Sequence, residues 1–214
     1  MPVSHHILIA DDHAIIRRGL KFILDAHFSG CYVNEADTIK EVKTLLGSFA
    51  FSHLIFDMQM LDDNIIEHLP EIRKLYPNIP ILIYTMSPEE IYGKRMLDMG
   101  ATGFLSKQSS ETEVIEALNS FLSGQPYISR QLKEKISKDD LKFNSESPID
   151  SLSDRELIVM NHILKGTGVK EISMKLDLKP TTVATYKARI FNKLGVSNVM
   201  DMRNILEVYR YTSS

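Results

Sequence analysis

The first 123 residues alternate short, β-rich apolar runs with longer segments in which apolar residues return every three or four positions. This alternation is typical of parallel βαβ units, because each strand needs a crossover helix before the next parallel strand can begin. Helices on both faces of the strands make a doubly wound sheet. We therefore predict an α/β domain of five βα units. The predicted strands are 7–10, 32–36, 54–56, 81–84 and 103–105, and the predicted helices are 14–27, 39–48, 65–76, 89–99 and 111–123.

The rest of the chain has a different pattern. Residues 144–148 are polar and rich in turn formers, which is typical of a linker. From Leu152 onward we expect four short helices, at 153–165, 169–176, 180–194 and 199–209. Ser153 with Glu156 fits a capping box, and Gly195 stands where a helix should end. These patterns divide the chain into an α/β domain at 1–124, a linker at 125–148 and a small all-α domain of four helices at 149–214.

The charge is distributed unevenly over these parts. Residues 1–148 hold 15 Lys and Arg against 21 Asp and Glu, whereas residues 149–214 hold 10 against 7. The stretch from Leu178 to Met200 carries four cations and no acid. A basic stretch of this kind is a candidate nucleic-acid surface.

The composition also restricts the cellular setting. No apolar run approaches the roughly 20 residues that a membrane-spanning helix needs, and the N-terminus has no signal-peptide pattern. The single cysteine, Cys31, excludes an internal disulfide and a cysteine-rich metal site. We therefore expect a cytoplasmic protein without a membrane partner.

Three carboxylates follow predicted strands. Asp11 and Asp12 end the first strand, and Asp57 ends the third. Ligands of open parallel sheets bind beyond the carboxyl ends of the strands, where the strand order reverses. If the strand order is 2-1-3-4-5, these acids converge there. Carboxylates gathered in this way suit Mg²⁺, which also accepts water and phosphate oxygens.

Two further strand ends contribute polar groups. Thr85 follows the fourth strand with a hydroxyl, and Lys107 follows the fifth with an ammonium group. A carboxylate that attacks a phosphoryl group needs neutralisation of the charge on the equatorial oxygens, which a metal ion, an ammonium and a hydroxyl supply. The pattern therefore favours phosphoryl transfer to Asp57.

The α/β domain resembles the receiver domain of two-component response regulators, which has a flavodoxin-like (βα)5 fold. The resemblance rests on Ile9-Ala10-Asp11-Asp12, on Leu54-Ile55-Phe56-Asp57-Met58-Gln59-Met60 and on Gly103-Phe104-Leu105-Ser106-Lys107. It implies that Asp57 is the phosphoacceptor and that Lys107 pairs with the phosphoryl group. It also implies a Mg²⁺ ion held by Asp11, Asp12, Asp57 and the backbone carbonyl of Gln59, and a switch pair formed by Thr85 and Phe104.

The C-terminal domain resembles the LuxR-type helix-turn-helix of the NarL/FixJ subfamily. Four segments carry this resemblance: 152–156, 170–176, 181–186 and 192–196. The residues agree with it, because Val183, Ile190 and Leu194 form a buried stripe on the segment 180–194 and leave the other face for the major groove. We predict base contacts from Thr185, Lys187 and Arg189, and contacts with the DNA backbone from Lys179, Thr181, Thr182 and Lys193.

The resemblance implies a DNA-binding transcriptional regulator and not an enzyme, apart from autophosphorylation from a phosphodonor and slow self-dephosphorylation. A sensor histidine kinase is the expected donor, and promoter DNA is the expected target. We expect phosphorylation to shift the receiver and to permit homodimerisation and promoter binding, with RNA polymerase as a further candidate partner.

Three alternative functions are less consistent with the residues. A phosphohydrolase of the haloacid dehalogenase type would need an aspartate two residues after the nucleophile, where this chain has Gln59. A receiver that acts without phosphorylation would have no use for the five polar groups at the strand ends. A sigma-factor-like protein would leave the α/β domain without a role.

Overall fold

A computed structural model describes residues 4–60, 63–130, 132–133 and 148–211, without the side chains of 204 and 207–211. The chain forms two compact units, Met1–Leu132 and Lys133–Ser214, and each is described by itself. Most of the predicted linker, 134–147, lies outside the described residues. No helix in the described part of the chain is long and apolar enough to cross a membrane.

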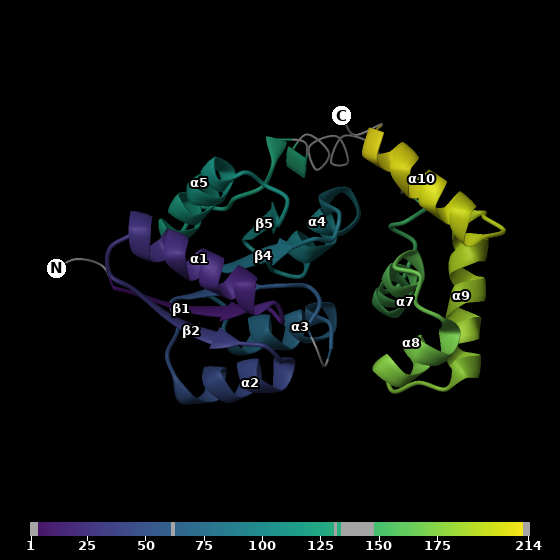
Figure 1. Cartoon of the computed structure of the whole chain (residues 1–214), viewed down its shortest axis with the longest axis horizontal. Coiled ribbons are helices and arrows are strands. Elements are labelled where there is room, and N and C mark those ends of the chain that lie inside the picture. The colour runs from purple at the N-terminus through teal and green to yellow at the C-terminus, as the bar shows by residue number, and fades with distance from the viewer. Residues whose placement is uncertain (1–3, 61–62, 131, 134–147, 212–214) are drawn as a thin grey trace. The chain divides into compact units, whose positions relative to one another are not determined.

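The first unit is a five-stranded, wholly parallel sheet with the strand order β2-β1-β3-β4-β5, which confirms the predicted topology (Figure 1). The strands are β1 (His5–Ala10), β2 (Cys31–Ala36), β3 (His53–Phe56), β4 (Ile81–Thr85) and β5 (Gly103–Ser106). The helices are α1 (Ala14–His27), α2 (Ile39–Ser48), α3 (Ile65–Leu75), α4 (Glu89–Asp98) and α5 (Glu111–Leu122).

Alternation along the strands builds a core on each face of the sheet. Ile7 and Ile9 of β1 pack with Leu20 and Leu24 of α1 and with residues of α5, so α1 and α5 share one face. Figure 1 shows these two helices together on one side and α2 and α3 on the other. Central strands that are covered on both faces have no solvent-facing positions, and every residue of β3 and β4 is accordingly buried.

One buried residue of β3 is titratable. His53 is only 6% exposed, lies edge-on to the ring of Phe121 and contacts the ring of His5, with both centroids 5.0 Å away. Burial, followed by repulsion from His5, lowers its pKa from 6.5 to about 4. The folded protein therefore resists protonation of this ring, whereas the unfolded chain does not.

We expect His53 to weaken the fold in acid. Because its pKa is lower in the folded state, its contribution is fully present above pH 6.5 and is lost as the pH falls towards about 4. By this linkage the cost reaches about 3 kcal/mol. Urea unfolding at several pH values should show a flatter profile for His53→Phe than for the native protein, while His27→Gln keeps the native profile. An unchanged profile for His53→Phe would contradict the assignment.

The segment that follows α5 packs against the first unit. Tyr127 forms a parallel bridge with Gly103, and its carbonyl accepts a hydrogen bond of 2.9 Å from the Phe104 backbone. Leu132 is 2% exposed and lies against Gly93 of α4, where a Cβ atom would come within 2.7 Å of the leucine side chain. The compact unit thus extends beyond the predicted boundary at residue 124. Residues 125–130 and 132 are called the exit segment below.

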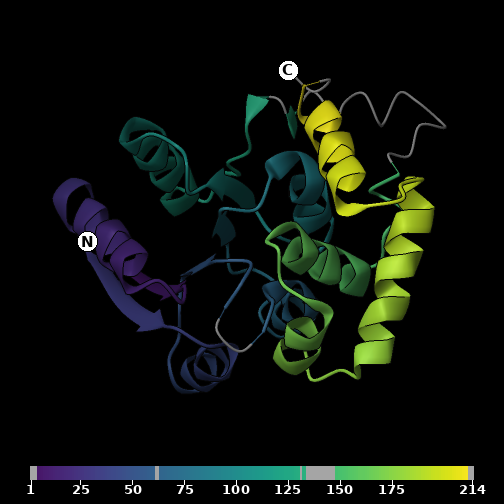
Figure 2. The ribbon, with the colours of Figure 1, turned by 45° about the vertical axis from the view of Figure 1, so that its right-hand side comes forward.

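The second unit consists of α7 (Asp154–Leu164), α8 (Val169–Lys175), α9 (Pro180–Leu194) and α10 (Val199–Tyr211). The predicted capping box of Ser153 and Glu156 is present, and Gly195 ends α9 in the left-handed conformation with φ of 65°. Figure 2 shows α7 and α8 packed beside the long α9. The buried stripe of α9 is Val183, Ile190 and Leu194, as the sequence predicts.

Candidate functional site

The acidic pocket lies at the carboxyl ends of β1 and β3. Asp11 is 2% exposed and Asp57 is 6% exposed. Backbone hydrogen bonds continue the sheet to both residues, from Asp11 N to the carbonyl of Ala36 and from Asp57 N to that of Ala10. The sheet itself therefore fixes where the two carboxylates leave the backbone.

Lys107 joins these two acids. Its Nζ atom lies 2.6 Å from Asp11 Oδ2 and 2.7 Å from Asp57 Oδ2. Burial by itself lowers the pKa of Lys107, but the Asp57 charge and hydrogen bonds to both acids outweigh it and raise the pKa above its ordinary value. Lys107 is therefore a fixed cation beside Asp57. The predicted convergence of these three residues is present in the fold.

The remaining oxygens fit a metal ion. Asp57 Oδ1 is buried and accepts no hydrogen bond from any described residue. Asp11, Asp12, His13 and Asp57 each offer a ligand atom within 4.8 Å of the others. An unsatisfied buried carboxylate oxygen is costly. A divalent cation at this position would satisfy it, so the residues fit the predicted ion.

Two residues of this pocket were not singled out by the sequence patterns. His13 contributes an imidazole, and Arg17 of α1 donates a 2.6 Å hydrogen bond to the Asp11 carbonyl and pairs with Glu35 at 2.8 Å. Arg17 thereby holds the loop that carries Asp11. Its spacing of six residues from Asp11 across a strand end and a first helical turn is the only signal of this role.

The predicted switch pair lies on neighbouring strands. Thr85 and Phe104 are both 1% exposed, and Thr85 Oγ1 accepts a 3.2 Å hydrogen bond from the Ser87 backbone. The backbone N–H of Lys107 donates a hydrogen bond to the Thr85 carbonyl, so the switch threonine and the pocket lysine are linked directly through the backbone. The role of the pair remains a prediction.

The exit segment contacts this switch region. The Tyr127 carbonyl accepts a hydrogen bond from the backbone of Phe104, and the Ser129 hydroxyl donates a hydrogen bond to Glu89 in the first turn of α4. Burial raises the pKa of Glu89, and the bonds with Ser129 oppose that shift without cancelling it. A change in Phe104 or α4 would therefore reach the exit segment directly.

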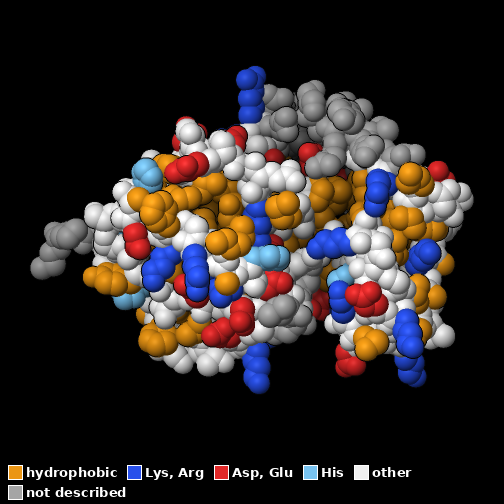
Figure 3. All heavy atoms as spheres, in the orientation of Figure 1, with side chains coloured by type: hydrophobic (Ala, Val, Ile, Leu, Met, Phe, Trp, Pro, Cys, Tyr) orange, Lys and Arg blue, Asp and Glu red, His pale blue; other side chains and the backbone are white. Residues whose placement is uncertain are grey.

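In the second unit, α9 presents the predicted DNA-binding residues. A shallow pocket is lined by Thr181, Thr182, Thr185, Tyr186 and Arg189. Figure 3 shows Lys and Arg side chains standing out from the side of this unit that carries α9. Lys187 lies over the ring of Phe191, 5.3 Å from its centroid, and Lys179 precedes the first turn of the helix.

Lys193 differs from these residues. Its Nζ atom lies 2.6 Å from Glu156 Oε2 and 2.9 Å from the Ser151 carbonyl. Glu156 is 3% exposed. The structure therefore joins Lys193 to a buried acid of α7, a partner that its sequence position did not reveal.

Each of the two units matches a known protein family. Residues 7–119 match the response regulator receiver domain, and residues 150–205 match bacterial regulatory proteins of the luxR family. The chain belongs to the response regulators. As a member of this family it is a transcriptional regulator with a receiver and a luxR-type helix-turn-helix, as predicted, and not a phosphohydrolase.

Relatives match the regulator over nearly its whole length. It is 31% identical to the response regulator UvrY of Escherichia coli (strain K12), over 94% of this chain and 92% of that protein. It is 30% identical to the response regulator GacA of Pseudomonas aeruginosa, over 92% of each chain. A structure of RcsB from Salmonella enterica serovar Typhimurium, bound to promoter P1flhDC with phosphomimetic BeF3-, has a TM-score of 0.72 and 26% identity, over 95% of this chain and 98% of RcsB.

Proposed function

We propose that Asp57 of this regulator accepts a phosphoryl group from a sensor histidine kinase. The supporting observation concerns its two carboxylate oxygens. Oδ2 contacts Lys107, and Oδ1 is buried and accepts no hydrogen bond from the part of the chain that the structure describes. A carboxylate oxygen of Asp57 attacks the phosphorus atom, and the bond from phosphorus to the donor nitrogen breaks. The donor leaves with that electron pair, and the product is an acyl phosphate.

The neighbouring side chains prepare this step. Lys107 neutralises charge on the phosphoryl oxygens, and Asp11, Asp12 and Asp57 with the backbone carbonyl of Gln59 would hold Mg²⁺. The bound ion supplies charge neutralisation and orients the phosphoryl group. Burial of Asp57 strengthens these electrostatic contacts, because little water screens them.

We propose that the signal leaves through Thr85, Phe104 and the exit segment. Once the phosphoryl group is present, the Thr85 hydroxyl turns towards it and the Phe104 side chain follows. Phosphorylation acts here as a local charge that biases a surface with two arrangements. The backbone bond between Phe104 and Tyr127 gives this change a path to the segment that leads to the second unit.

We propose that the phosphorylated regulator binds promoter DNA as a homodimer. The similar RcsB, whose structure is bound to a promoter, supports the DNA target. Thr185, Lys187 and Arg189 contact bases, and Lys179, Thr181 and Thr182 contact the DNA backbone. Lys193 contacts the DNA backbone as well, although its Nζ atom also pairs with Glu156. RNA polymerase is a further partner in this proposal.

The experiment that tests phosphorylation uses the purified full chain. The protein is incubated with Mg²⁺ and a small phosphodonor such as acetyl phosphate, and its intact mass is measured. We expect a gain of one phosphoryl group that depends on the ion and is lost in mild base, which hydrolyses acyl phosphates. No gain in mass would contradict the proposal.

A second expectation concerns Arg189. Its guanidinium lines the α9 pocket and can bind guanine through two hydrogen bonds. Arg189→Ala should weaken binding to a selected DNA site by about 1 to 3 kcal/mol and relax the sequence preference. Binding titrations at several salt concentrations measure this effect. The control is Lys21→Ala on α1, which removes one positive charge from the other unit. Equal affinities for Arg189→Ala and the control would contradict the assignment.

A further inference from the structure

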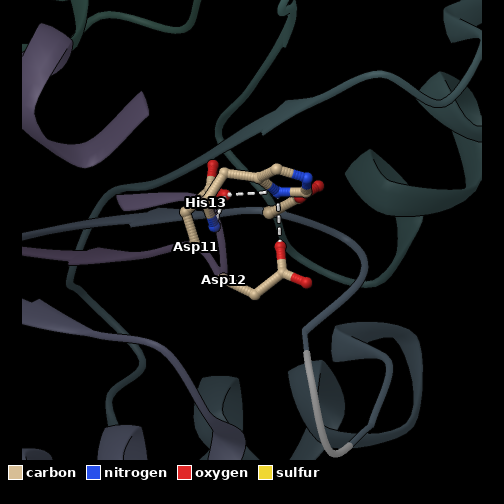
Figure 4. Close-up of side chains that lie close together, drawn as sticks. Asp11, Asp12 and His13 are labelled. Atoms are coloured by element: carbon tan, nitrogen blue, oxygen red, sulfur yellow. Dashed lines mark hydrogen bonds and ion pairs between the residues drawn. The ribbon is translucent and has the colours of Figure 1, made fainter. Parts of the chain in front are cut away.

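His13 directs a nitrogen atom towards the acidic pocket. Its Nδ1 atom lies 2.6 Å from Asp12 Oδ1 and 3.3 Å from Asp11 Oδ1, and Figure 4 shows the ring beside both acids. The side chain is 64% exposed, so packing does not force it into this position. The attraction of the two carboxylates accounts for the orientation.

The spacing of these atoms fits a coordination sphere. In an octahedral site with bonds of about 2.1 Å, neighbouring ligand atoms are about 3.0 Å apart and opposite ones about 4.2 Å apart. The distances of 2.6 and 3.3 Å from His13 lie on either side of the first value. One ligand atom from each of Asp11, Asp12, His13 and Asp57 lies within 4.8 Å of the others. This limit slightly exceeds the separation of opposite ligands, so a small inward movement of the side chains would let all four surround one ion.

Asp57 gives an independent indication of a ligand here. Its Oδ1 atom is buried and accepts no hydrogen bond within the described residues. Lys107 contacts Oδ2 of Asp57 and Oδ2 of Asp11, so the ammonium group does not use this atom. A position for a cation is thus left on the Oδ1 side of the pocket.

We propose that His13 is a ligand of the ion in this pocket and that it makes the site prefer first-row transition dications, such as Co²⁺ and Fe²⁺, to Mg²⁺. The inference rests on the metal site of the proposed function. Mg²⁺ prefers an all-oxygen environment, whereas an imidazole nitrogen raises the affinity for these transition metals. His13 therefore determines which ion supports the chemistry at Asp57.

The test measures binding and not activity. Calorimetric titrations of the full chain with Co²⁺ and with Mg²⁺ compare the native protein with His13→Ala at one fixed pH. The matched control is His27→Ala, which removes an imidazole from the other end of α1. We expect His13→Ala to weaken Co²⁺ binding by at least about tenfold, to leave Mg²⁺ binding nearly unchanged and to alter the visible absorption of bound Co²⁺.

The Asp57→Asn variant distinguishes the proposal that His13 is a selective ligand from the proposal that a metal ion binds at Asp57. If this variant weakens both ions while His13→Ala weakens neither, or weakens both equally, His13 is not the selective ligand and the inference fails alone. If Asp57→Asn leaves both affinities unchanged, the ions bind elsewhere and the metal site of the proposed function fails as well. A selective loss of Co²⁺ affinity in His13→Ala, together with loss of both ions in Asp57→Asn, supports both proposals.

Discussion

Replacement of Asp57 by asparagine is expected to abolish phosphorylation of the regulator. The amide cannot act as the nucleophile, because its oxygen carries no full negative charge and an acyl phosphate cannot form on it. It also leaves Lys107 with one anionic partner in place of two, Asp11 at 2.6 Å. Intact-mass analysis after treatment with acetyl phosphate and Mg²⁺ should show no phosphorylated species.

The matched control for this variant is Asp25→Asn. Asp25 is an exposed aspartate of α1, so the substitution changes the net charge equally without touching the pocket. It should be phosphorylated like the native protein. DNA binding should then respond to the phosphodonor in Asp25→Asn and not in Asp57→Asn. Persistent phosphorylation of Asp57→Asn would place the acceptor on another residue.

Replacement of Lys193 by methionine is expected to destabilise the second unit. The ammonium group of Lys193 is the charged partner of Glu156, whose side chain is 4% exposed. Without it, the carboxylate keeps hydrogen bonds from the backbone of Ser153, at 2.8 Å, and from its side chain, but it has lost its positive partner. Loss of one partner of a buried pair costs about 3 to 5 kcal/mol, and the partial exposure of Lys193 reduces this to about 2 kcal/mol.

The acid behaviour of the second unit should change with the same substitution. Burial raises the pKa of Glu156, but hydrogen bonds from Lys193 and Ser153 outweigh it, so the pKa lies below 4.5. A lowered carboxylate pKa stabilises the fold above the ordinary pKa, and this stabilisation is lost as the pH falls through the folded value. In Lys193→Met the pKa rises, and acid unfolding should begin at a higher pH.

Hydrogen exchange measured by mass spectrometry detects the loss of stability of the second unit peptide by peptide. Peptides from α7 and α9 should exchange faster in Lys193→Met, while peptides from the β-sheet serve as the internal reference. Lys175→Met is the matched control, because Lys175 forms an exposed pair with Glu171 whose loss costs at most about 0.5 kcal/mol. Weaker DNA binding with unchanged exchange would instead identify Lys193 as a contact with the DNA backbone.

The sequence by itself was enough to predict the architecture and the convergence of Asp11 and Asp57. The change from β-rich runs to helical periodicity, and the capping signals at Ser153 and Gly195, are local patterns that each segment carries independently. Parallel strands place their carboxyl ends at one edge, so Asp11, Asp57 and Lys107 could be brought together by topology alone. Asp11 and Asp57 follow the adjacent strands β1 and β3, and Lys107 follows β5, which lies on the other side of β4.

Only the tertiary structure decided which partner each side chain takes. Lys193 lies on α9 and Glu156 on α7, 37 residues apart, and no periodicity links them. Whether His13 faces solvent or the acids depends on the side-chain torsions of an exposed ring, and the docking of Leu132 on Gly93 depends on the shape of α4. Local sequence patterns are enough to predict where each strand ends. The partner of a long side chain depends on which group the packing of distant elements brings within its reach.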